Sequence, residues 1–162
     1  GHSVVTDSSG NVYFAGYTSG SSRIGTDQGG DDIFLVKFNS SGTEQWVQRL
    51  GSFGIEQVWS SDSAITDSSN NIYLTGWTTG GMDGNTHSGE RDIFLVKYNS
   101  SGTKQWTKQI GTSSNDAGLS FAIDNSSNIY VVGYTAGGLD NNTNIGNDDY
   151  FILKYNSSGV LQ

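Results

Sequence analysis

The chain contains a long internal repeat, which limits the folds it can adopt more than any other feature of its sequence. The segment DIFLVKFNSSGTEQW (Asp32 to Trp46) returns as DIFLVKYNSSGTKQW at Asp92 to Trp106, and 13 of the 15 positions are identical. A third copy begins at Asp149 with DYFILKYNSSG. Such similarity at a nearly fixed spacing indicates one structural unit built three times along the chain.

A second motif follows the same repeat and locates its one difference in length. The segment VYFAGYT (Val12 to Thr18) returns as IYLTGWT at Ile72 and as IYVVGYT at Ile129, so the spacings are 60 and 57 residues. The three-residue difference falls between Leu50 and Asp67. Because insertions concentrate in surface loops, we expect this segment, which includes Trp59, to form an exposed connection between two units.

Each unit consists of four short runs rich in β-branched and aromatic residues. Gly, Asn, Asp and Ser separate the runs and supply turn conformations, and no run keeps a helical period. Four antiparallel strands in about 60 residues make one β-propeller blade. We therefore predict an all-β fold of three four-stranded antiparallel blades, at about residues 1–53, 61–113 and 118–162.

Three motifs resemble one known repeat. They are DSSGNVY at Asp7 to Tyr13, DIFLVK[FY]NSSGT at Asp32 and again at Asp92, and G[ML]DxNT at Gly81 and again at Gly138. Together they resemble the SBBP β-propeller repeat of bacteria, over essentially the whole chain. The resemblance implies a propeller architecture and an envelope or secreted setting, and it implies no enzymatic activity.

A more distant similarity to NHL repeats implies the order of the strands. It makes residues Ser3 to Asp7 an innermost strand that lines the central channel, and Thr43 to Leu50 an outermost strand. Three blades do not close a ring, since propellers have about four to eight. Because an open arc exposes two apolar faces, we expect further blades as partners. They would come from the same longer chain, which we favour because the third copy stops at Gln162, or from a homodimer of six blades.

The composition narrows the class of partner. Eight Lys and Arg against 16 Asp and Glu give a net charge of −8, which disfavours nucleic acid and anionic membranes. No apolar stretch is long enough to insert into a bilayer. The abundance of Thr, Ser, Asn and Gly beside few Lys and Glu favours an extracellular or cell-surface location.

Oxygen-bearing side chains alternate ahead of a glycine in two equivalent loops. They are Asp83 and Asn85 in the second copy, and Asp140, Asn142 and Asn144 in the third. Calcium needs six to eight oxygen ligands from a sharply turned backbone, so the pattern suggests a calcium site, although the spacing is not that of an EF-hand. The alternative is a loop whose Asn and Asp side chains cap its own backbone. The sequence suggests no cofactor other than calcium.

Four aromatic residues are candidates for ligand binding. Tyr17, Trp77 and Tyr134 are equivalent, and each precedes a Thr and a Gly-rich loop, whereas Trp59 has no equivalent in the other copies. An exposed aromatic ring could stack on the apolar face of a sugar. Residues present in every copy usually serve packing between blades, so Trp59 is the preferred candidate.

Catalytic residues are not indicated. The only histidines are His2 and His87, there is no cysteine, and no nucleophile elbow, zinc motif or phosphate-binding loop occurs. Asp7, Asp67 and Asp124 recur at the start of a DSSGN-like turn, where we expect each to cap the turn rather than to form a ring of carboxylates. We predict a non-enzymatic structural or protein-interaction module, with a carbohydrate-binding, lectin-like propeller as the alternative.

Overall fold

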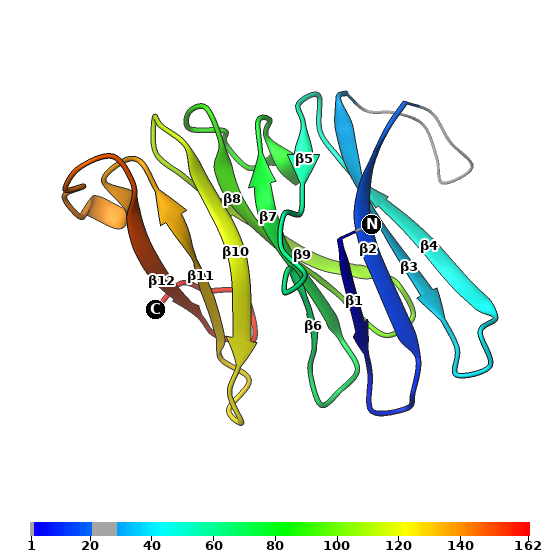
Figure 1. Cartoon of the computed structure of the whole chain (residues 1–162). Coiled ribbons are helices and arrows are strands. Elements are labelled where there is room, and N and C mark those ends of the chain that lie inside the picture. The colour runs from blue at the N-terminus through cyan, green and yellow to red at the C-terminus, as the bar shows by residue number, and fades with distance from the viewer. Residues whose placement is uncertain (1, 21–28) are drawn as a thin grey trace.

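The protein folds into three antiparallel sheets that stand side by side in an open arc, as the computed structural model shows (Figure 1). The structure describes residues 2–20 and 29–162. We call the sheets blades 1, 2 and 3 in chain order. The all-β prediction and the prediction of propeller blades are confirmed. No helix in the described part of the chain is long and apolar enough to cross a membrane.

Each blade is an antiparallel meander, and in blade 2 both β5 and β6 pair with β7. Blade 1 consists of β1 (Ser3–Thr6), β2 (Val12–Ser19), β3 (Asp31–Phe38) and β4 (Glu44–Leu50). Blade 2 consists of β5 (Glu56–Gln57), β6 (Ala64–Thr66), β7 (Ile72–Thr78), β8 (Asp92–Tyr98) and β9 (Lys104–Ile110). Blade 3 consists of β10 (Asp116–Ile123), β11 (Ile129–Thr135) and β12 (Asp149–Tyr155). Short 3₁₀ turns, η1 (Met82–Gly84) and η2 (Leu139–Asn141), follow β7 and β11.

Blade 3 differs from the prediction of four strands in every blade. After β12 the chain turns back and forms a single bridge, Tyr155 opposite Leu161, in place of an outer strand. Leu161, in the short segment after the turn at Gly159, supplies this one pair.

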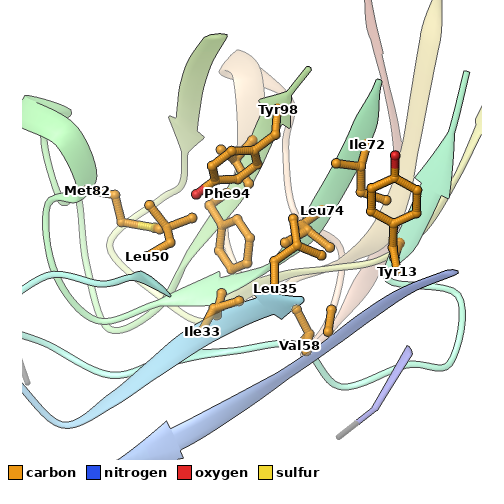
Figure 2. Close-up of a cluster of buried hydrophobic side chains, with 13 residues drawn as sticks. Tyr13, Ile33, Leu35, Leu50, Val58, Ile72, Leu74, Met82, Phe94 and Tyr98 are labelled. Atoms are coloured by element: carbon orange, nitrogen blue, oxygen red, sulfur yellow. The ribbon is translucent and has the colours of Figure 1, made fainter. Parts of the chain in front are cut away.

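Alternate residues of each central strand pack against opposite neighbouring blades. In β8, Phe94 belongs to the apolar core between blades 1 and 2, whereas Ile93 and Leu95 belong to the core between blades 2 and 3. This division follows from the two-residue period of a strand. Figure 2 shows the first core, where Ile33 and Leu35 of β3 point toward side chains of blade 2. The repeated apolar run therefore serves two interfaces at once.

The length difference between the repeats lies inside the innermost strand of blade 2, rather than in a connection between blades. In blade 3 this strand, β10, is continuous, and its register shifts between Gly118 and Ser120, with Leu119 as the extra residue. In blade 2 residues 59–62 stand in place of Leu119 and divide the strand into β5 and β6, both of which pair with β7. Four residues replace one, which accounts for the three-residue difference. We call residues 59–62 the inner-strand insertion.

Candidate functional site

The face of blade 3 that points away from blade 2 is apolar and uncovered. Tyr150 and Ile152 on β12 are 91% and 72% exposed. Their repeat equivalents in blade 2 are Ile93 and Leu95, which are 2% and 1% exposed because blade 3 covers them. A hollow of about 410 Å³ runs along β12 and the η2 loop, and residues of both faces of the strand line it, among them Tyr150 and Phe151. The same positions are thus interface in one blade and surface in the next.

The opposite end of the arc, on blade 1, shows the complementary arrangement. Val4 and Phe14 are exposed, and the Phe14 ring lies 5.4 Å from that of Phe34. The repeat equivalents in blade 2 are Ala64, Leu74 and Phe94, all buried in the core between blades 1 and 2. We call this surface and the one on blade 3 the open faces. Solenoid-like arrays normally end in capping repeats with a polar outer face, and neither open face has that character.

The inner-strand insertion brings two of the predicted aromatic residues together. Trp59 is 41% exposed, and its ring meets that of Trp77 edge to face at 5.3 Å. Its indole N–H donates to the Gln57 side-chain oxygen (2.9 Å), and the Gln57 amide in turn donates to Asp31 of blade 1 (2.5 Å). Trp77 itself is buried on β7. Of this pair, therefore, only Trp59 offers ring surface to a ligand.

Arg91 completes this cluster. Its guanidinium lies 4.2 Å from the Trp77 ring centre and 4.9 Å from that of Trp59. The backbone of Arg91 is held at the junction of blades 2 and 3, where its carbonyl accepts from the Asp116 N–H (3.0 Å). A cation over an indole face is favoured by about 0.5–2 kcal/mol. Trp59, Trp77 and Arg91 together are called the Trp–Arg cluster.

Tyr17 and Tyr134 do not join this cluster. Tyr17 is half-buried and stacks on His2 at 4.9 Å, and Tyr134 is half-buried on β11. Sequence reasoning missed Arg91, although a signal was present: the equivalent positions hold Asp31 and Asp148, so a cation here departs from the repeat.

The predicted calcium loops are organised by their own hydrogen bonds. Asp83 accepts from the Lys104 ammonium and the Thr107 hydroxyl. Burial raises the pKa of Asp83, but these two bonds outweigh that effect and the net pKa is lowered. Asn85 and Asn142 turn their amide N–H groups onto the carbonyls of Met82 and Leu139.

Asn144 also hydrogen-bonds to backbone of its own blade: its amide N–H donates to the Thr135 carbonyl (3.3 Å). Among residues 2–20 and 29–162, no three His, Asp or Glu side chains gather as they would around a metal ion. Calcium binding at Asp83, Asn85, Asp140, Asn142 and Asn144 stays a prediction.

The family comparison matches the repeat seen in the sequence. Residues 105–140 match the family model of the SBBP β-propeller repeat. This segment is one SBBP-type repeat unit. The matched segment runs from β9 of blade 2 through β10 and β11 to η2 of blade 3, so one family unit spans a blade boundary. No curated protein matches the chain.

Each SBBP-type repeat here contains an aspartate that caps a turn, as predicted. In blade 3, Asp124 accepts the backbone N–H groups of Ser126 and Asn128 on one oxygen (2.8 and 2.9 Å). Its other oxygen accepts from the Asn128 amide and the Tyr130 hydroxyl (2.8 and 3.1 Å). Asp7 and Asp67 make the equivalent bonds. All three carboxylates therefore serve the local turn.

These turns predict a loss of stability in acid. The bonds from Asn128 hold the pKa of Asp124 at about 2, below its ordinary 3.8. A lowered pKa stabilises the fold above the ordinary value, and this contribution disappears as the pH falls through the folded-state value. We expect the free energy of unfolding to decline between pH 4 and pH 2, as measured by urea titration. Asp124→Asn should have a flatter profile; parallel profiles would contradict the assignment.

Proposed function

We propose that this chain is a non-catalytic, protein-binding propeller module whose open faces bind further SBBP-type blades. One observation supports it most: the apolar side chains on both open faces are the repeat equivalents of those buried between blades. Tyr150 and Ile152 stand where Ile93 and Leu95 contact blade 3. An exposed surface built to the pattern of an interface is favoured to become one.

The two open faces suit each other. In each internal interface, side chains from a central strand pack against the inner strands of the next blade. Leu95 of β8, for example, shares a core with Phe121 of β10. Val4 is the equivalent of Phe121, so the face of blade 1 is the natural partner of the face of blade 3. Further blades of the same longer polypeptide would fit, and so would a second copy, in which two arcs of three close a ring with twofold symmetry.

In a purified sample the only source of blades is the chain itself. We therefore expect sedimentation or light scattering to give a mass of about 34.6 kDa, twice the 17.3 kDa of one chain. Tyr150→Asp should return the mass to that of one chain, because the interface would have to bury an unpaired charge. Gln105→Asp, which adds the same charge on an exposed part of β9, serves as the control. A folded chain of 17.3 kDa at high concentration would overturn the pairing of open faces.

The absence of catalysis is inferred from how the acidic groups are used. The turn aspartates cap hairpins, and the buried carboxylates Glu56 and Asp116 are held by Ser52 and Thr112 of the connections between blades. Each of these five groups has a structural role. The match of residues 105–140 to a β-propeller repeat agrees with this inference.

A location outside the bacterial cell belongs to the same proposal. It is supported by the Thr-, Ser-, Asn- and Gly-rich composition and by the net charge of −8. Fractionation of a bacterium that produces the parent protein tests it, since recovery in the cytoplasmic fraction alone would contradict it.

A further inference from the structure

We propose that the Trp–Arg cluster binds a carboxylated sugar, with Trp59 stacking on the ring of the sugar and Arg91 binding its carboxylate. The cluster lies in the middle blade, away from the open faces, so this inference does not depend on how the arc is completed. It specifies the ligand class for the carbohydrate-binding alternative, for which the exposed indole of Trp59 is the supporting observation.

The blade architecture does not require the inner-strand insertion. Blade 3 completes the same strand with one extra residue, Leu119. The insertion is nevertheless held in one conformation: the Ser60 hydroxyl accepts from the Asp62 N–H (3.1 Å), and the Ser61 carbonyl accepts from the Ser3 hydroxyl of blade 1 (2.6 Å). A segment that the fold does not need, yet holds rigidly, can bind a ligand with little loss of conformational freedom.

Trp59 is oriented as a stacking platform. Its N–H donates to Gln57, its ring meets that of Trp77 edge to face, and Arg91 lies over the ring, so its polar group is satisfied and the ring is held in place. With 41% of the residue exposed, the available surface is the apolar indole. Aromatic faces of this kind pack against the C–H face of a pyranose.

Arg91 supplies the complementary charge. Its half-buried guanidinium lies over the two indoles and has no hydrogen bond or ion pair with any described residue. The neighbouring Glu90 carboxylate instead accepts from the Asn115 amide. A guanidinium lying over aromatic rings keeps its N–H edge free, and that edge matches the two oxygens of a carboxylate.

Together these features select a sugar acid over simpler ligands. A neutral sugar would leave the Arg91 guanidinium unpaired, and a small carboxylate would leave the Trp59 face uncovered. A long polyanion would be repelled by the net charge of −8. The best match is therefore a single or terminal acidic sugar residue, which combines a pyranose face with one carboxylate.

Glucuronate is the probe for the test, with glucose, acetate and a short aspartate-containing peptide as comparisons. We expect NMR or calorimetric titration to show glucuronate binding at least about tenfold more tightly than each comparison, since a charge-assisted contact and a stacking contact each contribute about a factor of ten. Trp59→Ala and Arg91→Gln should each weaken binding by about tenfold or more. Arg91→Lys should recover part of the lost affinity, because it keeps the positive charge. The recovery should be incomplete, because lysine lacks the paired N–H donors of the guanidinium.

Two matched variants test whether the effect is specific to the cluster. Trp46→Ala removes an indole from the outer strand of blade 1, and Lys108→Gln removes a positive charge from β9 of the same blade as Arg91. Both should leave the affinity for glucuronate unchanged. Equal affinity for glucose and glucuronate, or a variant Arg91→Gln that binds normally and only melts earlier, would overturn the proposal. Equal binding of the acidic peptide would overturn the assignment to a sugar.

The outcome is separable from that of the proposed function. Trp59→Ala and Arg91→Gln should keep the mass of the unmodified chain in solution. Tyr150→Asp should keep its affinity for glucuronate. An unmodified chain that binds glucuronate but keeps a mass of 17.3 kDa would refute only the pairing of open faces, and one that pairs but does not bind glucuronate would refute only the sugar site.

Discussion

Replacing Phe94 by alanine is expected to lower the free energy of unfolding by about 3–5 kcal/mol, the usual cost of removing a fully buried phenylalanine. Phe94 is 0% exposed in the core between blades 1 and 2 (Figure 2). Its ring occupies space left by Gly76, where an added Cβ would lie 2.8 Å from Phe94 Cε1. The neighbouring strands are joined by ladder bonds, so they cannot collapse into the cavity.

The loss should be visible in thermal unfolding. For a domain of this size, 1 kcal/mol corresponds to about 2–4 °C, so the melting temperature of Phe94→Ala should fall by about 6–20 °C. Circular dichroism at several temperatures measures it.

The repeat provides a matched control. Phe34 has the same place in β3 that Phe94 has in β8, but it is only half-buried because it lies on the open face of blade 1. Phe34→Ala should cost clearly less than Phe94→Ala in dilute protein. If blades associate through the open faces, the cost of Phe34→Ala should grow with protein concentration. An equal loss of stability for both variants in dilute protein would contradict the conclusion that packing between blades determines the free energy lost.

Replacing Glu56 by alanine is the second large effect that we expect, with a loss of about 2–4 kcal/mol, because buried donors would be left without an acceptor. Glu56 is 0% exposed. It accepts from the Ser52 backbone N–H (2.8 Å), the Ser52 hydroxyl (2.5 Å) and the Thr78 hydroxyl (2.6 Å). It thereby ties the connection between blades 1 and 2 to the end of β7.

The pH dependence of this residue has the opposite sign to that of the turn aspartates. Burial raises the pKa of Glu56, and the hydrogen bonds from Ser52 and Thr78 offset only part of that rise. Its ionised form therefore reduces stability at neutral pH, and the fold regains stability as the pH falls through the raised pKa toward the ordinary 4.5. Together with Asp124, this predicts greatest stability in mildly acidic solution.

Glu56→Gln separates charge from hydrogen bonding. It keeps one acceptor oxygen and the side-chain volume, so it should cost less than Glu56→Ala. It should also abolish the gain in stability on mild acidification, as urea titration between pH 7 and pH 4.5 would show. Asp116→Ala, the equivalent change in blade 3, should destabilise in the same direction. An unchanged pH profile in Glu56→Gln would show that another group causes the gain.

Several features of this protein could be predicted because they depend on residues close together in the chain. The continuous apolar run in DIFLVK indicated a strand buried on both faces, and the DSSGN spacing placed Asp7 where it caps its own turn. The pairing of a loop residue with a distant strand could not be predicted in this way. Asp83, whose role as a calcium ligand stays a prediction, is paired with Lys104, which is 21 residues away.

By itself, the sequence determined that there are three repeated β units and that their turns are capped, since periodicity and turn chemistry are local properties. Only the tertiary structure decided that the three-residue insertion interrupts an inner strand, and that Trp59 there meets Arg91. These residues are 32 positions apart and are brought together by the pairing of β5 and β8 with β7 inside blade 2, which no sequence spacing encodes. Stacking also decided that Tyr150 and Ile152 are exposed while Ile93 and Leu95 are buried. The repeat makes the residues equivalent, and the presence or absence of a neighbouring blade makes them core or surface.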